Sequence, residues 1–87
     1  MDRNYIVETV NKVLSEEFEK DIALFTPDAH IRDDLNLDSL DIVDMIIALE
    51  AAFKFKLKDR SKILEIATMS DVYDFIEKTY QAEISAR

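Results

Sequence analysis

The chain has 87 residues with no cysteine, no glycine and one proline, and its formal net charge is −8 at pH 7. This length predicts a single domain over residues 1–87. The absence of cysteine excludes disulfides and thiolate metal sites. The absence of a long apolar run excludes a membrane span, and the acidic balance disfavours nucleic-acid binding. We therefore expect a cytoplasmic, helical protein, since 48% of the residues are hydrophobic and glycine turns are lacking.

The first predicted helix covers about residues 3–19, with Asp2 or Asn4 as its cap. Its apolar residues recur at helical spacing: Ile6, Val7, Val10, Val13, Leu14 and Phe18. A long connection, residues 20–37, follows and contains the turn signal Thr26-Pro27-Asp28. A loop of this length in a small domain needs apolar anchors, and we expect these to be Ile22, Leu24, Phe25, Ile31 and Leu35.

The second predicted helix begins at Asp38, a good N-cap residue, and Asp41 stands where it can complete a capping box. The apolar positions at helical spacing predict a face that packs in the core: Ile42, Met45, Ile46, Leu49 and Phe53. A neighbouring face holds residues spaced by four: Ser39, Val43 and Ile47.

A short third helix is predicted over residues 59–65, although the alternation over residues 54–58 also fits a short edge strand. The last helix starts at Thr68, with Asp71 at capping-box spacing. Its inner face is predicted to hold Val72, Phe75, Ile76 and Tyr80. The expected fold is all-α: a four-helix bundle with a long first loop and a short third helix.

Ser39 stands in a strongly acidic frame at the start of the second helix. No Lys or Arg lies between Asp33 and Asp44, and no His, Lys or Cys is near enough in sequence to activate the serine as a nucleophile. We therefore expect no catalytic residue, and we interpret Ser39 as an attachment point on which another enzyme acts. The simpler alternative is that Asp and Ser gather at helix starts only because they cap them.

The stretch from Asp34 to Phe53, DLNLDSLDIVDMIIALEAAF, resembles the acyl carrier proteins. The resemblance implies a 4'-phosphopantetheine arm on Ser39, in a cofactor-binding motif with Asp38 and Leu40. A separate, Mg²⁺-dependent phosphopantetheinyl transferase would add the arm from coenzyme A. Acyl groups would then be carried as thioesters for fatty acid biosynthesis, or for related specialised lipid or polyketide biosynthesis. The protein would be a carrier and not an enzyme.

The acids of the second helix have two interpretations. They can form an ordinary solvated face, or a docking strip for basic surfaces of partner enzymes. We favour docking because apolar residues lie between the acids, as in a small interface core. The expected partners are the transferase and the acyl-transferring and chain-modifying enzymes, and the expected state is a monomer without membrane insertion. The predicted partner-binding residues are Leu37, Asp41, Val43, Asp44, Ile47 and Glu50.

Three alternatives remain beside this interpretation. An aminoacyl or peptidyl carrier shares the serine and the fold, and an acidic helical adaptor needs no prosthetic group. Asp34, Asn36 and Asp38 match the first ligands of an EF-hand, but Ser39 replaces its glycine and Met45 its bidentate glutamate, so no metal site is expected. The single histidine, His30, fits a surface or loop-packing role.

The chain departs from the family pattern in two places. Asn36 stands where many members have glycine, and asparagine tolerates the left-handed backbone conformation. Residues 54–62 hold five bases and one acid, where carriers of fatty acid synthases usually stay acidic, and Ala51 and Ala52 stand where acids are common. The second departure predicts an altered set of partners and hence a specialised carrier.

Overall fold

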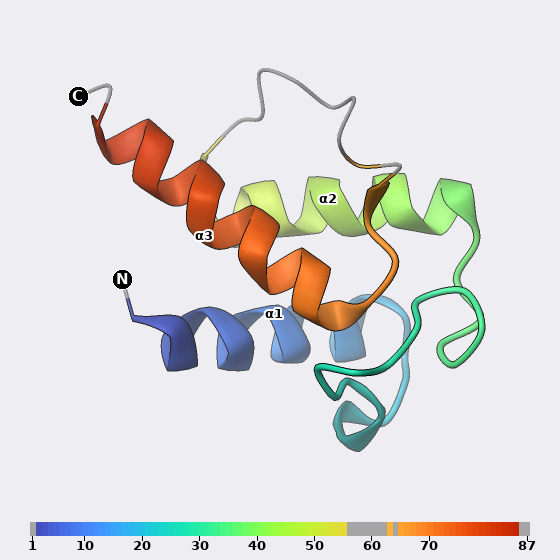
Figure 1. Cartoon of the computed structure of the whole chain (residues 1–87). Helices are drawn as coiled ribbons and strands as arrows, with labels where there is room; N and C mark the ends of the chain where they lie inside the picture. The colour runs from blue at the N-terminus through green and yellow to red at the C-terminus, as the bar shows by residue number, and fades with distance from the viewer. Residues whose placement is uncertain (1, 56–62, 64, 86–87) are drawn as a thin grey trace.

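The computed structural model describes residues 2–55, 63 and 65–85. Within these residues the secondary structure is helical, with α1 (Arg3–Glu17), the 3-10 turn η1 (Ile22–Leu24), α2 (Ser39–Phe53) and α3 (Met69–Ser85). α1 packs against both α2 and α3. The axis of α3 runs at an oblique angle to those of α1 and α2 (Figure 1). The all-helical prediction is confirmed. The predicted helix over residues 59–65 and the alternative strand over residues 54–58 fall mainly outside the described residues.

α1 begins where predicted, because the side chain of Asp2 accepts a hydrogen bond from the amide of Tyr5 at 3.1 Å. It ends at Glu17, two residues before the predicted end, since Glu19 has a left-handed backbone with φ of 52°. Ile6, Val10 and Leu14 are buried along its inner side. The remaining apolar residues of the predicted face are half-buried against the core: Val7, Val13 and Phe18.

The long loop between α1 and α2 is anchored by buried side chains, as expected, but by a different set. The prediction is confirmed for Phe25, Ile31 and Leu35. It is wrong for Ile22 and Leu24, which are 52% and 49% exposed. These two residues belong to η1, which the side chain of Asp21 caps and which has no buried residue. Two residues outside the predicted set are buried instead: Ala29 and Leu37.

Backbone hydrogen bonds join the long loop to the start of α3. The amide of Ile31 donates to the carbonyl of Ala67 at 2.9 Å, and the amide of Met69 donates to the carbonyl of Ala29 at 3.0 Å. His30 and Thr68 form an isolated bridge between the two segments. The loop that leads into α2 is thereby held against a second, distant part of the chain.

α3 starts with the predicted capping box. The hydroxyl of Thr68 accepts from the amide of Asp71, and the carboxylate of Asp71 accepts from the amides of Thr68 and Ala67 at 3.1 and 3.0 Å. These backbone hydrogen bonds lower the pKa of Asp71 from its ordinary value of 3.8. Of the predicted inner face, Val72 and Ile76 are buried, whereas Phe75 and Tyr80 are half-buried.

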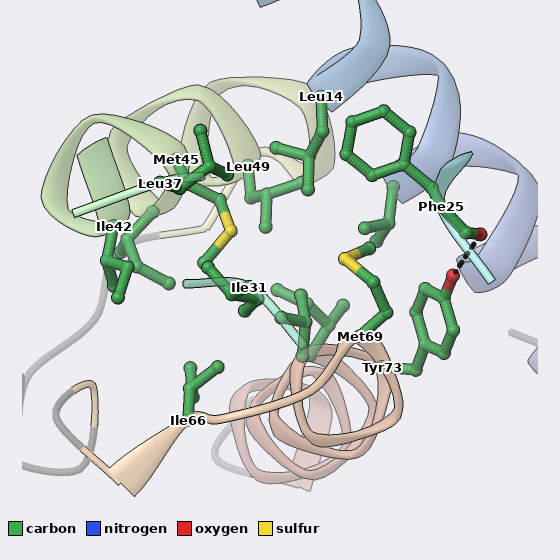
Figure 2. Close-up of a cluster of buried hydrophobic side chains, with 14 of the residues drawn as sticks. Leu14, Phe25, Ile31, Leu37, Ile42, Met45, Leu49, Ile66, Met69 and Tyr73 are labelled. Atoms are coloured by element: carbon green, nitrogen blue, oxygen red, sulfur yellow. Dashed lines mark hydrogen bonds between the residues drawn. The ribbon is translucent and has the colours of Figure 1, made fainter. Parts of the chain in front are cut away.

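The core lies between the three helices and the long loop (Figure 2). α2 contributes the five residues that helical spacing predicts, Ile42, Met45, Ile46, Leu49 and Phe53, all buried. Met45 and Met69 are both fully buried, from α2 and from the start of α3 (Figure 2). Tyr73 is also buried, and the predicted inner face of α3 did not include it.

Candidate functional site

The capping box fixes where α2 starts. The carboxylate of Asp38 accepts from the amide of Asp41 at 3.0 Å, and the carboxylate of Asp41 accepts from the amide of Asp38 at 3.1 Å. Both predicted roles are thereby confirmed. Ser39 becomes the first helical residue, and its side chain is exposed. Leu40, the next residue, is 76% exposed.

A tight reversal of the chain precedes this helix start. Asn36 has a φ of 56°, so its backbone is left-handed, as expected for an asparagine that replaces glycine. The amide of Leu37 donates to the carbonyl of Ile31 at 3.0 Å and closes the reversal. The carboxylate of Asp34 accepts from the amide of His30 at 2.7 Å inside the same turn. Short-range hydrogen bonds therefore set the direction from which the chain enters α2.

The reversal brings Arg32 beside Ser39. Its guanidinium Nη2 donates to the Ser39 Oγ at 2.8 Å. A shallow cavity of about 290 Å³ opens next to this contact and is lined by Arg32, Asn36, Leu37 and Asp38. Sequence reasoning missed Arg32 because it lies one residue before the acidic frame. The signal available was a base seven residues from the serine, separated from it by an asparagine able to turn the chain.

The outer face of α2 combines apolar and acidic side chains. Val43 and Ile47 are 39% and 50% exposed, on the same side of the helix as Ser39. Asp44 is exposed, and Asp41 and Glu50 are half-buried. Leu37, which was expected to extend this patch, is only 4% exposed and belongs to the core. Its burial corrects that expectation, because an anchor residue of the loop cannot also present its side chain to a partner.

The chemistry available at Ser39 is that of an acceptor. Among the described residues, the side chain within hydrogen-bonding distance of its hydroxyl is a guanidinium, which cannot take a proton. The described part of the chain also holds no group of three or more His, Cys, Asp or Glu residues arranged to bind a metal ion. The carboxylates of Asp34 and Asp38, two candidate EF-hand ligands, accept backbone amides instead.

These residues fit a phosphodiester on the serine. The oxygen of Ser39 is exposed, a cationic side chain contacts it, and it lies at the positive end of the α2 dipole. The first-turn amides of Ser39 and Leu40 have no hydrogen-bond partner among the described residues, which leaves them free to face an anion.

None of the helices in the described ranges is long and apolar enough to cross a membrane.

Comparison with known proteins agrees with this geometry. Residues 4–76 match the family model described as "Phosphopantetheine attachment site". The chain is 37% identical over 78 residues to an acyl carrier protein of Borreliella burgdorferi strain ZS7, covering 90% of this chain and 96% of that protein. It is 34% identical over 82 residues to one of Thermosynechococcus vestitus, covering 94% of this chain and 100% of that protein. It is 34% identical over 70 residues to one of Syntrophobacter fumaroxidans, covering 80% and 85%. The chain therefore belongs to the acyl carrier protein family, whose members are non-catalytic carriers that use a phosphopantetheine group.

Proposed function

We propose that Ser39 is the residue to which 4'-phosphopantetheine is attached, and that the protein carries acyl intermediates as thioesters on that arm. The observation that supports this most strongly is the exposed hydroxyl at the capped start of α2, inside the region that matches the attachment-site model. When bound, the group supplies a thiol, which this cysteine-free chain lacks. Such a thiol forms the thioester without any catalytic residue of the chain.

The attachment itself is a transfer from coenzyme A. The Ser39 Oγ forms a bond to the phosphorus that bears the pantetheine, the phosphoanhydride bond breaks, and adenosine 3',5'-bisphosphate leaves with the serine proton released. Because the contact found at the hydroxyl is a guanidinium, the transferase has to provide the base. In this scheme Asp38 holds the serine in the first helical turn, and the exposed Leu40 offers an apolar contact beside it.

We further propose that the outer face of α2 is the docking strip for partner enzymes with basic surfaces, the transferase among them. Support comes from two exposed apolar residues, Val43 and Ile47, on the face that also carries the serine. An interface of this composition uses a small apolar centre for contact and a charged rim for steering. The docking strip consists of Asp41, Val43, Asp44, Ile47 and Glu50.

The pathway and the whole-chain arrangement belong to the same proposal. The relatives are named acyl carrier proteins, which favours acyl over aminoacyl cargo and a role in fatty acid or related lipid biosynthesis. The bases at positions 54–62 favour a specialised pathway. They stand where carriers of fatty acid synthases usually have acids, which the basic surfaces of synthase enzymes would bind. We propose that residues 1–87 form one monomeric, cytoplasmic carrier domain with the architecture of a four-helix bundle.

The decisive experiment is a modification assay with intact mass as its readout. The apo-protein is incubated with coenzyme A, Mg²⁺ and a broad-specificity phosphopantetheinyl transferase. The wild type should gain the mass of one arm, Ser39→Ala should gain none, and the control Ser15→Ala should behave as the wild type. An unmodified wild type, where a known carrier is fully converted, would overturn the proposal, and so would addition to Ser39→Ala.

A further inference from the structure

The guanidinium of Arg32 is directed at the attachment oxygen instead of at a carboxylate. It donates one hydrogen bond, to the Ser39 Oγ at 2.8 Å. A guanidinium has five N–H donors, so this single bond leaves most of them available. Within the described residues Arg32 makes no salt bridge; Arg3 is the base that pairs with acids, at Asp74 and Glu77. The charge of Arg32 is therefore available beside the serine.

Three of the acids that follow Arg32 in sequence are engaged elsewhere. The carboxylate of Asp34 accepts from the amide of His30, and those of Asp38 and Asp41 accept from each other's amides. Each of these bonds holds a turn or a helix start. Moving a carboxylate to Arg32 would leave one of those amides without its partner, which costs about 1 kcal/mol or more. These three carboxylates therefore serve the turn and the helix start, and Arg32 forms no salt bridge among the described residues.

The residue before Arg32 is held by two backbone hydrogen bonds. Ile31, the residue before it, is fully buried, and its amide donates to the carbonyl of Ala67 at 2.9 Å. The carbonyl of Ile31 accepts from the amide of Leu37 at 3.0 Å. The cavity of about 290 Å³ lies alongside, between Arg32 and Asp38. A long side chain on a fixed base thus reaches the serine and has open space beside it.

We propose that Arg32 binds the phosphodiester that joins the prosthetic arm to Ser39, and holds the first atoms of the arm against the loop preceding α2. This inference rests on the proposed attachment at Ser39. Esterification removes the hydroxyl proton and converts Oγ into an ester oxygen. The charged, non-bridging oxygens then lie one phosphorus atom away from the atom that Arg32 already contacts. Arginine pairs with phosphate through two parallel N–H donors, more strongly than with a neutral hydroxyl.

The contact has a physical purpose in this chain. The arm adds a negative charge to a segment that already contains Asp33, Asp34, Asp38, Asp41 and Asp44. The negative phosphodiester and these carboxylates repel one another, and the repulsion is strongest at low salt, where screening is weak. A guanidinium placed on the phosphodiester offsets this repulsion and restricts the direction in which the arm leaves the protein. Arg32 would therefore be a positioning residue for the arm, with no part in the chemistry at its thiol.

The test compares holo-proteins by phosphorus NMR after mass spectrometry has shown complete addition of the arm. The variants are Arg32→Ala and Arg32→Gln, which both remove the charge. The control is Lys78→Ala, which removes an exposed charge on α3, a helix whose far half points away from the start of α2 (Figure 1). In the wild type, the phosphodiester resonance should be displaced from its position in the urea-unfolded protein. Both Arg32 variants should lose most of that displacement, and Lys78→Ala should keep it.

A second readout uses the side-chain N–H signal of Arg32, which should shift when the arm is added to the wild type. If the arm is attached and both Arg32 variants show the wild-type phosphorus resonance, the inference is wrong while the proposed attachment stands. If no arm can be attached to Ser39, the mass shows this before any NMR is recorded, and both proposals fall. Arg32→Gln keeps the comparison valid if Arg32→Ala fails to fold, because glutamine retains length and polarity.

Discussion

At the scale of single residues, Tyr73 shows how one side chain joins separate parts of this small fold. It lies on α3 and is 1% exposed. Its hydroxyl is 2.5 Å from Oδ1 of Asn11 on α1 and 3.4 Å from the carbonyl oxygen of Phe25 in the long loop (Figure 2). Burial raises the pKa of the Tyr73 phenol from its ordinary value of 10.0, because the charged form would lose its hydration.

Removing this hydroxyl should destabilise the protein. We expect Tyr73→Phe to lower the free energy of unfolding by about 1 kcal/mol at neutral pH, since a buried hydrogen bond is lost and Asn11 loses its partner. The control is Tyr5→Phe, at a side chain that is 52% exposed, and it should have little effect. Urea denaturation of the three proteins measures the difference, and equal midpoints for Tyr73→Phe and the wild type would contradict it.

The same residue predicts a dependence on alkaline pH. Because the phenol has a higher pKa in the folded state than in the unfolded state, the unfolded chain ionises first. The stabilisation is therefore complete below the ordinary pKa and is lost as pH rises through the folded value. Above about pH 10 the wild type should lose stability more steeply than Tyr73→Phe. Parallel stability curves for the two proteins would show that the burial of Tyr73 does not control this loss.

At the scale of elements, α2 has two faces with different tasks. Its inner face is set by packing, with Met45, Ile46 and Leu49 at most 1% exposed. Its outer face keeps Val43 and Ile47 in solvent, where they gain nothing in the free protein. When a basic partner covers this face, burial of the two apolar side chains stabilises the complex and the acids attract the partner's basic residues. This contrast within one helix is the structural basis of the proposed docking strip.

The docking strip predicts a charge-reversal effect on association. Asp44→Lys should slow arm addition by a phosphopantetheinyl transferase about tenfold at low ionic strength, because steering by opposite charge is lost. The defect should shrink as salt is added, since exposed charges are screened. The control Glu16→Lys makes the same charge change at an exposed position of α1 and should leave the rate near that of the wild type.

The measurement is the initial rate of arm addition at several salt concentrations. Asp44 is chosen because it is exposed and, unlike Asp41, takes no part in the capping box. If both reversals slow the reaction equally, net charge alone governs the encounter and the strip has no special role. If neither does, partners bind elsewhere on the surface.

At the scale of the whole molecule, the distribution of charge opposes folding. Residues 1–44 hold 12 acids and 4 bases, whereas residues 45–87 hold seven of each. The salt bridges between described residues join Arg3 on α1 to Asp74 and Glu77 on α3, at 2.9 and 3.1 Å. They tie the first turn of α1 to α3, but they lie apart from the acids around Ser39. Among the described residues no salt bridge joins those acids to a base, so their mutual repulsion is a cost in the free protein.

This imbalance predicts stabilisation by salt. Adding NaCl or Mg²⁺ should raise the melting temperature, by roughly 5 °C for each kcal/mol of repulsion that is relieved in a domain of this size. Comparing the two salts at equal ionic strength separates screening from ion binding. A melting temperature that does not respond to either salt would show that the acids are already compensated. A large response to Ca²⁺ alone would favour a specific calcium site, contrary to our interpretation.

The sequence by itself determined the features that depend on neighbours within one helical turn. The capping boxes at Asp38 and Thr68 and the inner face of α2 were predicted from the local pattern and are present. The left-handed turn at Asn36, which was expected from the resemblance to family members with glycine there, is present as well. Each depends on hydrogen bonds or side-chain spacing over three to five residues, so the local pattern contains the physical cause. The exposure of Ser39 follows from helical spacing, because the serine shares the outer face of α2 with Val43 and Ile47 and lies off the apolar face that packs in the core.

Only the tertiary structure decided which residues meet across the fold. The contact of Arg32 with Ser39 needs the chain reversal at positions 36 and 37 and the hydrogen bonds that hold the loop against the start of α3. The burial of Leu37 and Tyr73, and the exposure of Ile22 and Leu24, depend on how that loop covers the helices. The local sequence gives an apolar side chain the same tendency to be buried at each of these positions. Its burial is therefore settled by the surface that the rest of the chain brings against it.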